Sequence, residues 1–209
     1  MLDRLCEGLL QTEGLDEGLQ AEQTAVLESV EMFENRQYLS EVDEVRADET
    51  AEIMAEVFTP EVVAGWAELS LEQKTAKLNE YYVKAGENLG IQTKGVIVEP
   101  MYSQPGMISF GYNSGDGYIH LNEAVVQDPE MLGQVLDTAT HEMRHQFQTE
   151  VVAEPERFGD LPSDVVAQWQ YEFANYISPD YDYQGYYEQA IEQDARSFAD
   201  EVLQSYMEK

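Results

Sequence analysis

Apolar residues recur every three or four positions through the first 90 residues, which is the spacing of one face of a helix. Such runs predict helices near residues 15–33 and 42–57, and a well-bounded helix over residues 71–89. The last of these follows a capping-box sequence that starts at Ser70, and Gly90 provides a typical helix end. We therefore expect this part of the chain to be helical.

The pattern changes after residue 90, where three short stretches are rich in β-branched and aromatic residues. They cover residues 95–99, 107–112 and 118–121, and a glycine-rich turn at 113–117 separates the last two. Strands joined by short connections usually pair in antiparallel fashion. The sequence therefore predicts a small antiparallel sheet of about three strands.

Helical periodicity returns after the predicted sheet. Asp128-Pro129 and Leu161-Pro162 are typical helix starts, and the first of these helices has an apolar face from Leu132 to Phe147. A last helix is expected from about Tyr186 to Tyr206. Helices, a short sheet and further helices together predict an α+β fold dominated by helix.

Composition narrows the classes of function. The 209 residues include 11 Lys and Arg against 42 Asp and Glu, which gives a net charge of −31. This charge disfavours nucleic acids and anionic membrane surfaces as partners, because both require a basic surface on the protein. The lone cysteine, Cys6, excludes an intramolecular disulfide framework.

Targeting signals are not apparent in the sequence. The start of the chain lacks a basic region followed by an apolar run, and no apolar stretch is long enough to cross a bilayer. The default expectation is a soluble cytoplasmic protein. Export by a route without a signal peptide, or origin in a longer chain, would leave the same pattern. The oligomeric state is not predicted.

The segment that carries chemical information reads His141-Glu142-Met143-Arg144-His145, an H-E-x-x-H motif inside a predicted helix. Four residues make about one helical turn, so the two imidazoles project from one side and can bind one metal ion. Glu142 lies between them and is placed to act as general base. Zinc lowers the pKa of a bound water to about 7, which suits such a base.

Two ligands are too few for a catalytic zinc ion, which takes three protein ligands and a water molecule. With three histidines in the chain, the third ligand is either a carboxylate or His120. The last predicted helix offers Glu188, Glu192 and Asp194. The residues alone leave these alternatives open.

The motif and the last helix together resemble the gluzincins, zinc metallopeptidases of the zincin fold, whose third ligand is a glutamate three residues before a small alanine. Glu192 and Ala195 match that pattern. The resemblance implies that Glu192 is the third ligand, with Glu188 as an alternative or supporting residue. It spans residues 70–207 and extends to compact metallopeptidase units of bacterial toxins and mobile elements.

The same resemblance implies a zinc metallopeptidase that cleaves a peptide or protein substrate. It divides the chain into a helical N-terminal region (residues 1–69) and a zincin-like domain (residues 70–209). The substrate is expected to add a strand along an edge near residues 118–122.

Metallopeptidases of this kind often use a tyrosine or histidine to stabilise the oxyanion. The candidates for this role are Tyr183, Tyr186, Tyr187 and His120. A tyrosine-rich surface loop would account for the tyrosines equally well.

Two rival hypotheses remain. In the first, the protein binds zinc but is latent, because residues 1–60 fill its cleft. In the second, it is an acidic interaction protein without catalysis, and its two histidines are incidental. Bound metal in the purified protein would separate the second rival from the others.

Overall fold

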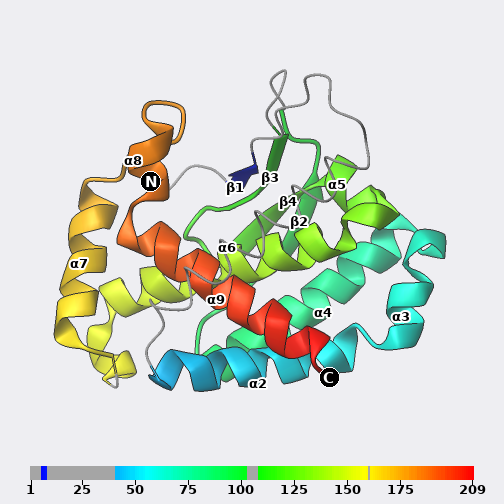
Figure 1. Ribbon diagram of the computed structural model, residues 1–209, viewed down its shortest axis with the longest axis horizontal. Helices are drawn as coiled ribbons and strands as arrows, with labels where there is room; N and C mark the ends of the chain where they lie inside the picture. Colours follow the sequence, from blue (N-terminus) through cyan, green and yellow to red (C-terminus); the bar gives the residue numbers. More distant parts are fainter. Residues whose placement is uncertain (1–5, 9–40, 103–107, 160) are drawn as a thin grey trace.

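The computed structural model describes residues 6–8, 41–102, 108–159 and 161–209 (Figure 1). Its strands are β1 (Cys6–Gly8), β2 (Gly95–Glu99), β3 (Ile108–Asn113) and β4 (Tyr118–Asn122). Its α-helices are α2 (Glu41–Val57), α3 (Pro60–Ala64), α4 (Leu71–Leu89), α5 (Glu123–Gln127), α6 (Leu132–Ala153), α7 (Ser163–Ala174), α8 (Tyr183–Tyr187) and α9 (Ala190–Met207). The prediction of a helix-dominated α+β fold is confirmed, whereas the helix predicted near residues 15–33 lies outside the described residues.

Helix α4 begins and ends where its sequence signals predict. The Ser70 hydroxyl accepts a hydrogen bond from the Gln73 backbone, and the Gln73 side chain accepts one from the Ser70 backbone, at 3.2 and 2.9 Å. Gly90 ends the helix in the left-handed region with φ of 74°, which glycine adopts without steric cost. Local side-chain chemistry therefore sets both ends of α4.

The sheet is mixed, in the order β1-β3-β4-β2, so the prediction of an antiparallel sheet is wrong. β3 and β4 form an antiparallel pair, but β2 runs parallel to β4, with Gly95 opposite Tyr118. β2 and β3 follow each other in the sequence but lie on opposite sides of β4. β2 therefore pairs with the far side of β4 and not with β3.

This strand order also corrects the expected substrate edge. β4, which covers residues 118–122, lies between β3 and β2 and has no free edge. β3 carries β1 on its other side, with Glu7 opposite Ser109 (Figure 1). The strand that packs on α6 is chiefly β3.

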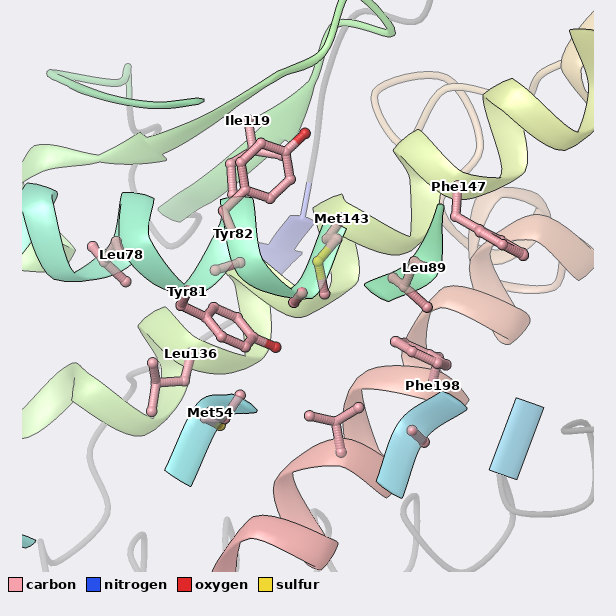
Figure 2. Packing of buried hydrophobic residues seen from close by; sticks show 14 of the residues in the cluster. Met54, Leu78, Tyr81, Tyr82, Leu89, Ile119, Leu136, Met143, Phe147 and Phe198 are labelled. Carbon is pink, nitrogen blue, oxygen red and sulfur yellow. The ribbon is translucent and has the colours of Figure 1, made fainter. Parts of the chain in front are cut away.

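One hydrophobic core joins the helices to the sheet. Figure 2 shows side chains of α2, α4, α6 and α9 converging below β4, among them Met54, Tyr81, Met143 and Phe198. Residues 41–69 contribute to this same core through α2 and through Trp66, which is almost fully buried. Residues 41–69 and the motif helix thus share one apolar interior.

The last predicted helix is in fact two. α8 ends at Tyr187 and α9 begins at Ala190, with Gln189 between them. The Gln189 side chain bonds both the backbone N–H and the carbonyl of Ile177, at 2.8 and 3.1 Å. These bonds fix the point at which α9 starts, and no periodic pattern of apolar residues reveals them.

No helix among the described residues combines the length and the apolar character that crossing a bilayer requires.

Candidate metal centre

Three potential metal ligands meet where α6 and α9 pack together. His141 and His145 lie one turn apart on α6, and Glu192 lies in the first turn of α9. The two Nε2 atoms are 3.0 Å apart, and Glu192 Oε2 lies 3.4 Å from that of His141 and 3.5 Å from that of His145. The structure thus brings together the three residues that the sequence and the resemblance single out.

Helices α6 and α9 pack directly against each other. Ala195 and Ala199 are buried on α9, and Ala139 is buried on α6. The start of α9 is fixed further by Glu172 of α7, whose carboxylate accepts a hydrogen bond from the Ile191 backbone at 2.9 Å. Glu192 follows directly, so its position depends on α7 as well as on α6.

The cluster is deeply buried. His141 is 3% exposed and Glu192 is 1% exposed, whereas the His145 side chain is 13% exposed. Glu192 Oε1 accepts a hydrogen bond from the Tyr176 hydroxyl at 3.3 Å, but Oε2 has no hydrogen-bond partner among the described residues. Such an oxygen requires a cation beside it, either a metal ion or, without metal, the protonated imidazole of His145 at 3.5 Å.

The size of the cluster fits a tetrahedral metal ion. Ligand atoms about 2.0–2.2 Å from a tetrahedral zinc ion lie about 3.4 Å from one another. The two distances to the carboxylate, 3.4 and 3.5 Å, match this value, whereas the 3.0 Å between the two Nε2 atoms is also a hydrogen-bond distance. Hydrogen bonds from imidazole to carboxylate would be shorter, near 2.7–3.2 Å. Two nitrogens and one carboxylate oxygen are also a donor set that zinc prefers.

Charge and burial separate the pKa values of the two histidines. Burial lowers the pKa of His141 to about 4. Burial also disfavours the charged form of His145, but the negative charges of Glu192 and Glu142 outweigh it and raise the pKa of His145 to about 9. Without metal, the pair of histidines therefore carries one positive charge at neutral pH, on His145.

Metal binding is expected to release the proton that gives His145 this charge. Both Nε2 atoms must be unprotonated to bind metal, so about one proton should leave per metal ion at pH 7. Because the raised pKa belongs to His145, affinity should fall about tenfold per pH unit from about pH 9 down to about pH 4, and faster below. Calorimetric titration with zinc in buffers of different ionisation enthalpy measures the proton count. Binding without proton release would contradict this arrangement.

Glu142 lies on a different side of α6 from the two histidines. It is 2% exposed, and its backbone carbonyl accepts a hydrogen bond from the Asn113 side chain at the end of β3, at 3.0 Å. Gly111 permits this approach, since a Cβ atom there would lie 2.7 Å from Thr138 of α6. β3 therefore covers the turn of α6 that carries Glu142.

The remaining candidates lie apart from the three ligand atoms. His120 bonds Glu99 at 2.8 Å and stacks on Tyr112, on the sheet. Glu188 is exposed, outside α9, and accepts a hydrogen bond from Gln184. Neither joins the group of potential ligands, which consists of His141, His145 and Glu192.

The tyrosine candidates form an aromatic cluster on α8. Tyr183 contacts the rings of Tyr186 and Tyr187, and Arg196 lies over the Tyr187 ring at 3.8 Å. The tyrosine that reaches the ligand set is Tyr176, which precedes α8. Tyr176 lies near the tyrosine-rich stretch of the sequence, but nothing in the sequence distinguishes it from the other tyrosines there.

A buried salt bridge adjoins the site and was missed in the sequence. Arg144, inside the motif, is fully buried and binds Asp194 of α9 through Nε and Nη2, at 2.7 and 2.8 Å. Its Nη1 binds Asp43 of α2 at 2.9 Å. An arginine on the apolar side of a helix requires buried acidic partners. The position of Arg144 in the sequence could therefore have predicted a buried salt bridge.

No family model, no curated protein and no solved structure matches the chain. The function is therefore inferred from the residues of the site.

Proposed function

We propose that this protein is a zinc metallopeptidase of the zincin type, with His141, His145 and Glu192 as ligands. The observation that carries the proposal is the size and composition of the triangle of ligand atoms, with sides of 3.0, 3.4 and 3.5 Å. The buried Oε2 atom of Glu192 supports it, because a bound cation would satisfy that atom.

A zinc ion in this position would supply an activated water molecule near neutral pH and would polarise a peptide carbonyl. Glu142 follows His141 directly in the motif and shares its buried surroundings. Its negative charge already acts on His145, so its carboxylate lies within electrostatic reach of the ligands. In the proposed reaction Glu142 takes the proton of the attacking water and passes it to the departing amine.

Metal content tests the first part of the proposal. The purified protein is expected to hold one zinc ion per chain by elemental analysis. His141→Ala and Glu192→Ala should each lower zinc affinity by more than about 100-fold, because they remove a ligand and not merely an outer contact. Competition with a chromogenic chelator measures the affinity.

Glu188→Ala is the matched control, since Glu188 is an exposed glutamate two positions before the start of α9. Its zinc affinity should equal that of the unmodified protein. Stoichiometric zinc in both ligand variants would refute the site. Absence of zinc from the unmodified protein, with normal folding, would favour the acidic interaction protein.

A second form of this function, a latent peptidase, is favoured by one observation. β1 pairs in antiparallel register with β3, the strand that packs on the motif helix. An extended peptide substrate could add to the sheet at that edge of β3. We propose that residues 6–8 occupy this edge, so that activity requires their displacement.

Glu7→Pro tests latency in the full chain. Proline removes the backbone N–H at this position and weakens strand pairing. If the edge is blocked, loss of about 1 kcal/mol of pairing should raise peptide cleavage about fivefold. Glu7→Ala, which keeps the N–H, should cleave at the original rate. Equal rates for both variants in a fluorogenic peptide assay would rule out blocking by this strand.

A further inference from the structure

The Nδ1 atom of His145, which does not face the other two ligands, has a defined partner. His145 Nδ1 lies 2.8 Å from Oε1 of Gln148, which is fully buried in the next turn of α6. Two assignments of the hydrogen are possible for this contact, because an imidazole nitrogen can donate or accept and an amide has both kinds of atom. The other contacts of Gln148 decide between them.

The amide nitrogen of Gln148 faces two atoms that can only accept. It lies 2.8 Å from the carbonyl oxygen of Ile191 and 2.6 Å from Oδ2 of Asp194. The amide N–H groups must therefore point toward α9, and the amide oxygen must point toward His145. An oxygen accepts, so the hydrogen of this contact belongs to His145 Nδ1.

Asp194 is in turn held in place. Arg144 binds both of its carboxylate oxygens in a two-pronged contact, and Asp43 of α2 holds the far side of the same guanidinium. Bidentate guanidinium–carboxylate pairs have a fixed geometry. Asp194 therefore presents its Oδ2 atom to Gln148 in one orientation.

We infer that Gln148 is a positioning residue of the metal site, which holds His145 as the tautomer that carries hydrogen on Nδ1 and leaves Nε2 bare. Nε2 is the atom that faces His141 and Glu192. Asp194, clamped by Arg144, sets the direction of the amide. Outer contacts of this kind fix the orientation and the basicity of a ligating imidazole. The effect on metal affinity rests on the proposed function, whereas the tautomer does not.

Two substitutions separate this role from simple packing. Gln148→Met fills the same volume but offers no acceptor, and it should lower zinc affinity about 10- to 100-fold. Gln148→Glu keeps an acceptor for His145 but turns an oxygen toward the Ile191 carbonyl and Oδ2 of Asp194, so it should cost stability. Its zinc affinity should nevertheless fall less than that of Gln148→Met, because Nδ1 of His145 keeps its acceptor. If Gln148 served only to join α6 to α9, the two variants would lose affinity equally.

Gln146→Met is the matched control on the same helix. Gln146 is also buried, but its amide bonds the Gly117 backbone and Glu150. Its replacement should cost stability and leave zinc affinity within about threefold. An equal loss in this variant would show that any buried glutamine of α6 matters, and would overturn the inference.

The tautomer is measured without metal, by nitrogen-15 NMR of the histidine side chains above the pH at which His145 loses its charge. The unmodified protein and Gln148→Glu should show hydrogen on Nδ1 of His145. Gln148→Met should show a mixture or the opposite tautomer. Hydrogen on Nε2 in the unmodified protein would overturn the inference, even in a protein that proves to have no peptidase activity. A protein with the expected tautomer that binds no zinc would instead refute the proposed function alone.

Discussion

Glu142→Gln should bind zinc as tightly as the unmodified protein and lose about 10²- to 10⁴-fold in peptide cleavage, the usual contribution of a general base. The amide has nearly the same size as the carboxylate, so the buried position of Glu142 remains filled. What it lacks is the ability to take a proton. Turnover of a peptide that the unmodified protein cleaves, together with zinc content, provides the measurement.

The pKa of His145 provides an internal control for the same substitution. The charge of Glu142 contributes to the raised pKa of His145, so its removal should lower that pKa. NMR titration of the metal-free protein follows this change independently of activity. A variant with the lowered pKa and undiminished turnover would place Glu142 near the site but outside the reaction.

The histidine pair was predictable because its information is local. Two histidines four residues apart on a helix must share a face. Glu192 was identified by resemblance, through its spacing to Ala195, and both residues are buried against α6 in the structure. The identity of the metal and the reaction remain predictions, because neither follows from the positions of these side chains alone.

The order of the strands was not predictable in the same way. Each strand was located from its own residues, but the neighbour of β2 depends on how the chain passes from β2 to β3. Short connections suggested an antiparallel sheet, and this local rule failed because β2 pairs with β4. The expected substrate edge at residues 118–122 was wrong for the same reason.

The partners of Arg144 illustrate a third limit. The position of Arg144 beside Met143 and Phe147 indicates burial, and burial of a guanidinium requires acidic partners. The chain has 42 acidic residues, so the sequence offers far too many choices. Asp43 lies 101 positions away along the chain. Only the packing of α2 against α9, which itself packs on α6, selects it.

Arg144→Leu should be the most destabilising of the substitutions considered. It should lower the free energy of unfolding by about 3–5 kcal/mol, because it leaves the buried carboxylate of Asp194 without its cationic partner. Arg144 is fully buried, and its guanidinium lies over the rings of Phe147 and Phe198 at 4.6 and 4.7 Å. Leucine keeps part of this apolar contact but leaves Asp194 without its bidentate partner. Asp43 suffers less, because Arg46 also contacts it at 3.1 Å.

Arg157→Leu is the matched control for this loss. Arg157 also bridges two carboxylates, those of Glu150 and Glu154, at 3.2 and 2.9 Å. It lies at the surface, where water screens the charges, so its replacement should lower the free energy of unfolding far less than Arg144→Leu does, even with the loss of its hydrogen bond to the Gly90 carbonyl at 2.8 Å. Urea denaturation of both variants measures the difference. If the two arginines proved equally dispensable, the buried salt bridge would not hold α9 against α6, and the support of Gln148 through Asp194 would have to come from packing alone.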